Sequence, residues 1–114
     1  MSITQIHKRI RAIKAELSEL GPLHPGTLTE QYNVCGTPGC RCKDPTKPEK
    51  HGPYHQLSFT WRGKSTSRFV REPRIELTQQ KLANYKRLRE LTNEWVGLEI
   101  ALEALEREAA KKAR

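Results

Sequence analysis

Residues 35–42 read Cys35-Gly36-Thr37-Pro38-Gly39-Cys40-Arg41-Cys42, and they contain every cysteine of the 114-residue chain. A histidine, His51, follows at the head of the segment His51-Gly52-Pro53-Tyr54. Three thiolates and one imidazole form a Cys3His set, which is a common tetrahedral ligand set for structural zinc. The glycines and the proline between the first two cysteines allow the tight turn that would bring both sulfur atoms to one ion. The sequence therefore predicts a Zn²⁺ site formed by Cys35, Cys40, Cys42 and His51.

The fourth ligand of this site has alternatives. In order of preference, the candidates are His51, then His55, and then His24 or Asp44. An odd number of cysteines argues against a complete disulfide framework, and Cys40 and Cys42 are too close in sequence for an easy bridge. Three reduced cysteines in a surface loop, without a metal, remain the alternative interpretation.

These two motifs also resemble a family of small, largely uncharacterised bacterial and archaeal proteins, a domain of unknown function often met near mobile elements. The resemblance covers about residues 26 to 90. The positions that match the family pattern are Cys35, Cys40, Cys42, His51, Gly52, Pro53 and Tyr54. His55 and Gln56 depart from it, since the family tends to continue with more tyrosines, and this departure favours His51 over His55 as the ligand. The resemblance implies no activity.

Length and composition indicate the size of the core and the cellular location. The chain is long enough for one compact domain with an extension. Its hydrophobic fraction of 35% and aromatic fraction of 6% cannot fill a large core, so we expect a metal and helix pairing to add stability. No apolar run approaches the ~20 residues of a membrane helix, and the start lacks the apolar segment of a signal peptide. We expect a cytoplasmic protein without membrane contact, because free thiols persist there.

Helices are predicted at both ends of the chain. Apolar residues recur at steps of three and four over residues 3 to 20, which is typical of a coiled-coil helix, and Gly21-Pro22 ends it. The same spacing predicts a second helix from Pro73 to about Lys111. The chain thus divides into an N-terminal coiled-coil helix (1–21), a zinc-loop β domain (22–72) and a long C-terminal helix (73–114).

The charges of the two helices predict how they meet. Each helix is basic in its early part and acidic in its late part, so opposite charges face each other only if the helices run antiparallel. At ~1.5 Å per residue the second helix is about twice as long as the first, and its apolar stripe exceeds what the first helix can cover. We therefore expect a homodimer through the distal half of the second helix. The apolar residues there are Trp95, Val96, Leu98, Ile100, Leu102 and Leu105.

The segment between the helices is predicted to form three strands, over residues 27–34, 54–61 and 64–71. In the second of these, Leu57, Phe59 and Trp61 alternate with polar residues, and Arg62-Gly63 is typical of a hairpin turn. The fold class is therefore α+β: a small three-stranded antiparallel sheet with a Cys3His zinc loop, framed by two antiparallel helices. We expect the apolar face of the sheet to lie against the second helix.

The charge of the chain points to nucleic acid as a partner. A net charge of +8 and a pI near 9.7 attract a polyanion. A three-stranded sheet with a polar, basic outer face and a following helix resembles the arm-binding domains of some tyrosine integrases and the plant AP2-type domains. Those domains lay the sheet in the major groove, so the resemblance favours DNA over RNA, and RNA remains the alternative. The candidate nucleic-acid-binding residues are Arg41, Lys43, Gln56, Ser58, Thr60, Arg62, Lys64 and Arg68.

Two other classes of function are considered. A protein-interaction module would use the same apolar helices to dock onto a larger enzyme such as a transposase or recombinase. An enzyme is not expected, because four ligand candidates would leave no open position on the metal. The sequence also holds no Gly-rich phosphate loop, no Ser/His/Asp order and no His-Glu-x-x-His motif.

Overall fold

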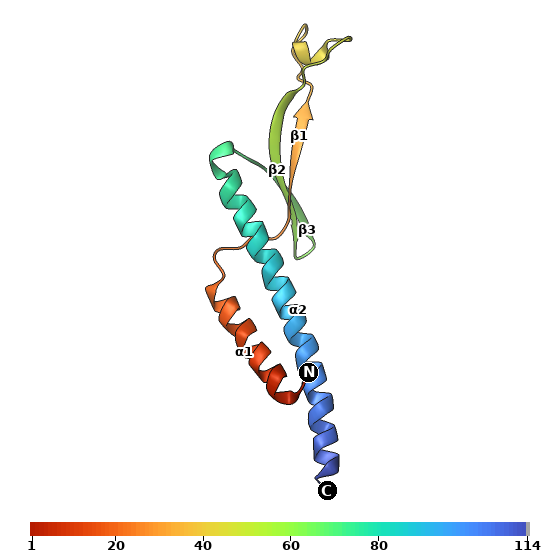
Figure 1. Cartoon of the computed structure of the whole chain (residues 1–114). Helices are drawn as coiled ribbons and strands as arrows, with labels where there is room; N and C mark the ends of the chain where they lie inside the picture. Colours follow the sequence, from red (N-terminus) through yellow and green to blue (C-terminus); the bar gives the residue numbers. More distant parts are fainter. Residues whose placement is uncertain (114) are drawn as a thin grey trace. The chain divides into compact units, whose positions relative to one another are not determined.

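The computed structural model describes residues 1–113, which form two helices and one sheet of the α+β class (Figure 1). In chain order the elements are α1 (Ile3–Glu19), β1 (Thr27–Asn33), the 3-10 turn η1 (Arg41–Lys43), β2 (His51–Trp61), β3 (Lys64–Val70), the 3-10 turn η2 (Glu72–Arg74) and α2 (Ile75–Lys112). The predicted elements are all present. The main difference in their bounds is that β2 begins at His51, which places this histidine in the sheet.

The contacts of the chain group its residues into two units. One unit contains residues 1–23 together with the residues from 83 onward, and the other contains residues 24–82. We call the first the helical unit and the second the sheet unit. The first turns of α2 belong to the sheet unit, and the rest of α2 belongs to the helical unit. Within residues 1–113, no helix combines the length and the apolar character that crossing a bilayer requires.

Helix α1 begins with a complete capping box. The amide of Gln5 donates to Ser2 Oγ at 3.2 Å, and the amide of Ser2 donates to Gln5 Oε1 at 2.8 Å. Each bond satisfies a backbone donor that has no partner within the helix. The helix ends at Glu19, and Leu20 is already extended ahead of Gly21-Pro22. The sequence thus fixes both ends of this helix locally.

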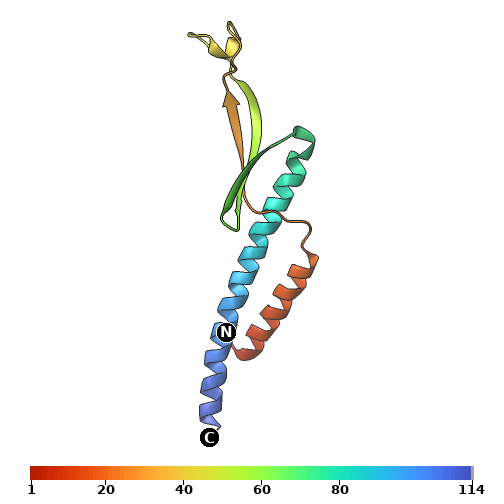
Figure 2. The ribbon, with the colours of Figure 1, turned by 180° about the vertical axis from the view of Figure 1, so that it is seen from behind.

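In the helical unit, α1 lies antiparallel along α2 (Figures 1 and 2). Arg9, early in α1, forms a bidentate ion pair with Glu94. Its Nε donates to Oε2 at 2.6 Å and its Nη2 donates to Oε1 at 2.8 Å. Glu16, late in α1, pairs with Arg87, which precedes Glu94 in α2. Hydrogen bonds from these two arginines lower the pKa of both carboxyl groups. The predicted antiparallel orientation is confirmed.

The core of the helical unit is formed by both helices. One buried cluster consists of Ile6, Ile10 and Leu102, with the partly buried Ile3, Trp95 and Leu98 packed against it. Ile13 of α1 and Leu91 of α2 are fully buried as well. Helix α1 therefore covers Trp95, Leu98 and Leu102, and the expectation that these residues exceed its reach was wrong. The reason is that α1 lies along the middle of α2, between Arg87 and Leu102, and not along its start.

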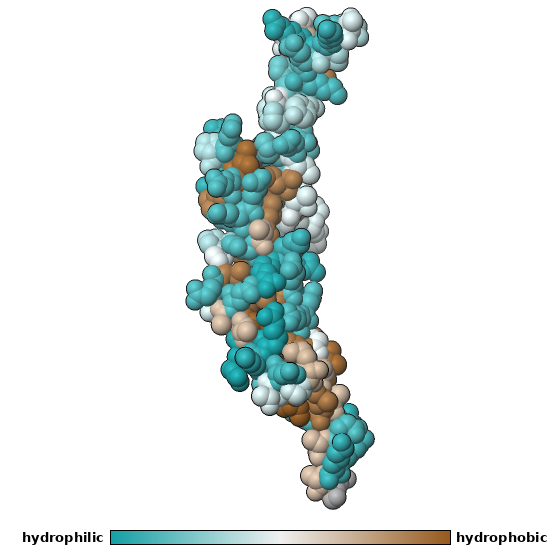
Figure 3. Space-filling model, viewed as in Figure 1, coloured by the Kyte–Doolittle hydropathy of each residue, from teal (hydrophilic) through white to brown (hydrophobic). Residues whose placement is uncertain are grey.

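Other apolar side chains of this unit remain at the surface. Val96, Ile100 and Leu105 stay exposed on α2. Apolar side chains are visible where the start of α1 lies beside α2 (Figure 3). These exposed side chains could contact a second copy of the chain, so the homodimer stays a prediction.

In the sheet unit, the strands lie in the order β1-β2-β3 and are antiparallel. Arg62 and Gly63 join β2 to β3 with positive φ angles of 50° and 79°. Two consecutive residues with positive φ form a type I′ turn, whose twist matches that of the flanking strands. The turn places Trp61 directly opposite Lys64 and so fixes the register of the whole hairpin.

This register assigns the residues of β3 to the two faces of the sheet. Directly opposed residues of antiparallel strands project to the same face. Because Leu57 is opposite Arg68, and Trp61 is opposite Lys64, these two basic residues lie on the apolar face. The other face carries mostly small polar side chains: Thr27, Thr29, Gln56, Ser58, Thr60, Ser65 and Ser67.

The apolar face of the sheet is covered at one place and open at another. Leu57 is buried, and the ring of Phe59 meets the ring of His24 edge-on, with 4.7 Å between centroids. The amide of His24 in turn donates to the carbonyl of Lys81 in α2, at 3.1 Å. Trp61, by contrast, is 62% exposed. The expectation that all three apolar residues of β2 face the helix was therefore wrong for Trp61.

Candidate metal centre

The sheet brings the two ends of the cysteine loop together. The last residue of β1, Asn33, pairs with the first residue of β2, His51. The chain therefore leaves the sheet and returns to it at the same place, and the intervening loop carries the three cysteines (Figure 1). Only glycine fits after His51, because a Cβ at position 52 would lie 2.8 Å from the carbonyl oxygen of Gln31, and φ there is 142°.

Short turns fold the loop back on itself. The amide of Cys40 donates to the carbonyl of Thr37 at 3.4 Å, and Gly39 between them has a positive φ of 78°. The amide of Lys43 donates to the carbonyl of Cys40 at 3.0 Å within η1. The amide of Glu49 then donates to the carbonyl of Arg41 at 2.9 Å and closes the far side of the loop. These turns return Cys40 and Cys42 to the neighbourhood of Cys35.

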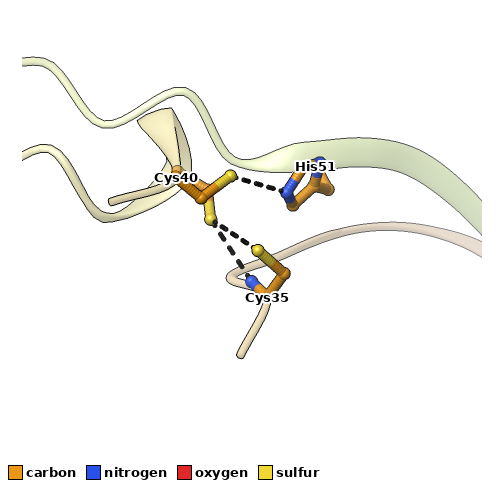
Figure 4. A group of neighbouring side chains, drawn as sticks. Cys35, Cys40 and His51 are labelled. Atoms are coloured by element: carbon orange, nitrogen blue, oxygen red, sulfur yellow. Dashed lines mark hydrogen bonds between the residues drawn. The ribbon is translucent and has the colours of Figure 1, made fainter. Parts of the chain in front are cut away.

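The three sulfur atoms and the His51 imidazole form one group. All four ligand atoms lie within 4.8 Å of one another. The Sγ atoms of Cys35 and Cys42 are 3.5 Å apart, and Cys40 Sγ is 3.2 Å from His51 Nε2. Figure 4 shows the labelled side chains of Cys35, Cys40 and His51 pointing toward one another. Zinc at its usual bond lengths separates such atoms by about 3.6–3.8 Å, so a small adjustment would fit the group around one ion.

The surroundings of the group favour the thiolate form of Cys35 and Cys40. The amide of Cys35 donates to Cys42 Sγ at 3.3 Å. A hydrogen bond from the amide of Thr37, and bonds within the group, lower the pKa of Cys35 to about 6. The amide of Cys42 likewise lowers the pKa of Cys40, whereas burial raises the pKa of Cys42. Amide donors stabilise a thiolate because they place positive charge beside the sulfur.

The histidine of the group responds to the same negative charge. Hydrogen bonds to Cys35 and Cys40 raise the pKa of His51 above its usual value. Sulfur atoms that hold a proton on the imidazole in this way form an environment that prefers a cation. Three thiolates and an imidazole complete a tetrahedral coordination, so the group could hold a metal ion without a further ligand.

The other candidates for the fourth ligand have different partners. His55 lies opposite Glu30 in the sheet, with Nε2 3.4 Å from the carboxylate. His24 Nδ1 lies 2.6 Å from the carbonyl of Pro25. Asp44 accepts a hydrogen bond from the amide of Thr46 at 2.9 Å. The geometry thus selects His51 among the four alternatives.

A pair of histidine variants tests this selection. We expect His51→Ala to weaken metal binding by more than about 100-fold, because it removes a ligand itself and even the loss of a residue supporting a ligand costs 10- to 100-fold. His55→Ala, four residues along the same strand, should bind metal as the wild type does. Competition with a chromogenic chelator measures both affinities. The opposite ranking would move the fourth ligand to His55.

The structure separates the candidate nucleic-acid-binding residues into three groups. Gln56, Ser58 and Thr60 share the polar face of the sheet, where Ser58 and Thr60 bond across to hydroxyl groups of β3 at 3.1 and 3.0 Å. Arg62, Lys64 and Arg68 lie at the turn and on the other face. Arg41 and Lys43 lie in η1. The expectation of one polar and basic face was therefore wrong.

Sequence reasoning missed the exposure of Trp61. Its alternation with Leu57 and Phe59 placed it in the core, but it lies beside the turn at the tip of the β2–β3 hairpin. The guanidinium carbon of Arg62 lies 5.3 Å from the centre of its ring. The turn itself held the missing signal, because a two-residue turn after Trp61 must place Lys64 beside it.

Comparison with known proteins identifies a family. A family model described as a domain of unknown function (DUF6788) matches residues 3–80 of the chain. No curated protein and no solved structure gives a match. The matched region contains the whole cysteine loop, the sheet and the start of α2.

Proposed function

This chain belongs to the DUF6788 family, a domain of unknown function, and we propose that it is a zinc-binding accessory protein that binds nucleic acid. Its metal is zinc, because a sulfur-rich tetrahedral set suits zinc among the common biological cations. Its nucleic acid is DNA rather than RNA. The family resemblance described under Sequence analysis also supports a role as an accessory protein of a mobile element.

The observation that carries this proposal is the exposed tip of the β2–β3 hairpin. Trp61 is 62% exposed, and the side chain of Arg62 lies over its ring. Lys64 projects from the same face, directly opposite Trp61. An exposed aromatic ring beside two cations offers a stacking surface together with phosphate contacts.

The basic residues of the hairpin are free to meet phosphates. Arg62, Lys64 and Arg68 are exposed. Among the described residues, no carboxylate forms a salt bridge with any of the three, whereas Arg41 lies 3.8 Å from Glu49. A cation without a carboxylate partner gains most from a phosphate, since it gives up no ion pair. The hairpin is therefore the first candidate surface, and η1 is the second.

The metal has a structural role in this proposal. Four protein ligands leave no open coordination position, which is typical of structural rather than catalytic zinc. The end of the sheet that carries the loop is hydrophilic in Figure 3. A loop so poor in apolar residues needs a metal to hold its shape, because it has little surface to bury. We therefore propose binding and not catalysis.

A charge-matched pair of triple variants tests the hairpin. Changing Arg62, Lys64 and Arg68 to alanine should weaken binding to duplex DNA and lower the slope of log K against log salt by about 0.9 for each phosphate that the protein no longer neutralises. The control changes Lys8, Arg11 and Lys86, which are exposed residues of the helices, and so removes the same charge. Anisotropy titrations at several salt concentrations give both slopes.

Two results would contradict the hairpin assignment. The first is an equal decrease of slope in both triple variants, because net charge alone would then explain binding. The second is an unchanged slope in the hairpin variant. Since Lys64 and Arg68 lie on the apolar face, zinc content and thermal unfolding must first show that the variant is folded.

A second candidate function is a protein-interaction module. It is favoured by the exposure of Val96 and Ile100, which are 59% and 68% exposed and lie one turn apart on α2. Such a surface could dock onto a larger enzyme or onto a second copy of the chain. Apolar docking tolerates salt, whereas nucleic-acid binding weakens steeply with it. The salt titration above therefore separates the two candidates.

A further inference from the structure

A pocket of about 870 Å³ lies beside the metal centre within the sheet unit. Its walls come from the ends of the three strands, η2 and the start of α2: Asn33, Cys35, residues 51–55, residues 69–72 and Ile75. Its volume lies in the range of sites for small organic molecules, which is about 300–1,000 Å³. Because Cys35 and His51 belong both to the metal group and to the pocket, a bound metal would fix this wall.

Two aromatic rings form an open apolar wall of this pocket. Tyr54 is 42% exposed and Phe69 is 65% exposed. Their ring centres are 6.3 Å apart and their planes meet at 66°, so the rings contact each other edge to face. This arrangement leaves ring surface without a partner in the described chain. An unpaired aromatic face is a platform for another flat ring, and every nucleobase has such a face.

Polar groups of the pocket suit the edge of a base and its phosphate. Asn33 offers both hydrogen-bond donors and an acceptor, and Glu72 offers acceptors for an exocyclic amine. Arg71 is exposed, and no carboxylate in the described part of the chain forms a salt bridge with it. A free guanidinium beside a ring-sized pocket is suited to bind the phosphate attached to a stacked base.

We propose that this pocket binds an unpaired base of single-stranded nucleic acid, stacked against Tyr54 and Phe69, with the adjacent phosphate on Arg71. The inference rests on the proposed function, and it adds the kind of strand that is recognised. A base inside a duplex is stacked on both faces and paired along its edge, so it cannot enter. The protein therefore distinguishes unpaired strands, loops or ends from continuous duplex.

The test compares two single strands of equal length and charge, one with bases and one abasic. Wild-type protein should bind the strand with bases roughly 5- to 150-fold more tightly, the range expected for one stacked base. Because Trp61 at the hairpin tip is a second exposed ring, the leucine variant is made in a Trp61→Leu background. There the double variant Tyr54→Leu, Phe69→Leu should lose the preference that the Trp61→Leu parent retains, and it should bind the abasic strand as the parent does. Tyr54→Phe keeps the ring and should keep the preference.

The outcomes separate the pocket from the hairpin. The triple alanine variant of Arg62, Lys64 and Arg68 should weaken binding to both strands and leave their ratio unchanged. If the wild-type protein binds no nucleic acid at all, the proposed function fails. If it binds both strands equally, or if the leucine variant keeps the preference, the pocket proposal is wrong and the proposed function stands. Equal affinity for adenosine monophosphate and for the strand would also overturn the pocket's assignment to a strand.

A second variant keeps the proposal testable if the leucine variant does not fold. Arg71→Gln should lower the salt slope on a single strand by about 0.7, the value of one neutralised phosphate. Arg74→Gln is the matched control, because Arg74 is an exposed arginine of the same region and does not line the pocket. Equal slopes in the two variants would remove Arg71 from the site and overturn the proposal. Zinc content and thermal unfolding establish that each variant is folded.

Discussion

A Cys42→Ser variant is expected to lose its metal and to unfold the loop between β1 and β2. Cys42 is the most buried member of the metal group, at 1% exposed, and its sulfur contacts both the sulfur and the amide of Cys35. Structural zinc contributes about 10–16 kcal/mol of apparent binding free energy at neutral pH. That is as large as the whole stability of a typical domain, about 5–15 kcal/mol, so the sheet unit should not survive the loss of its metal intact.

Native mass spectrometry and thermal unfolding check this expectation. The wild type should carry one zinc ion per chain, and the variant should carry none and unfold at a much lower temperature. A chelator should bring the wild type to the same state. Thr46→Ser, at an exposed position of the same loop, is the control and should change neither quantity. Metal-free wild-type protein with the thermal stability of the untreated sample would refute the proposed metal centre.

The metal group could be predicted from sequence because its chemistry is specific. Three cysteines within eight residues and a nearby histidine have few other uses in a chain without a disulfide framework. The choice between His51 and His55 could not be made from the residues alone, since both lie close to the loop in sequence. It depends on the pairing of Asn33 with His51, which sets where β2 begins.

The faces of the sheet were predicted for β2 but not for β3. Leu57 and Phe59 alternate with polar residues, and this pattern identifies the apolar face of β2. Strand β3 starts with small polar and basic residues and ends with two consecutive apolar residues, Phe69 and Val70, so its own sequence does not alternate and does not indicate a face. Its orientation follows from the length of the turn, and the turn puts Lys64 and Arg68 on the side of Trp61. The pocket at Tyr54 and Phe69 depends on the same register.

The helices show the same division between pattern and register. The distribution of charge predicts that α1 and α2 run antiparallel, and the pairs Arg9–Glu94 and Glu16–Arg87 agree. The extent of their overlap is not encoded as clearly, because a three-four repeat allows one helix to slide along the other by whole repeats. The prediction therefore left Trp95 and Leu102 for a second chain, although α1 covers them.

An Ile13→Asp variant is expected to separate α1 from α2. The side chain of Ile13 is fully buried, at 0% exposed, and the helical unit has few other buried residues. Removing such a side chain costs about 2–5 kcal/mol as alanine, and a carboxylate without a buried partner costs more. Little of the stability of a small helical unit would remain. Ala12→Asp introduces the same charge at the neighbouring exposed position and should leave the pairing unchanged.

The fluorescence of Trp95 reports this separation directly. Trp95 packs against the core that α1 completes, and Lys14 of α1 lies 5.1 Å from the centre of its ring. In a Trp61→Phe background it is the only tryptophan, so Ile13→Asp should shift the emission to the red and Ala12→Asp should not. Zinc content should stay at one ion per chain, because the metal group belongs to the other unit. An unshifted emission in the Ile13→Asp variant would show that α1 does not cover Trp95, and the surplus apolar surface of α2 would then require a second chain.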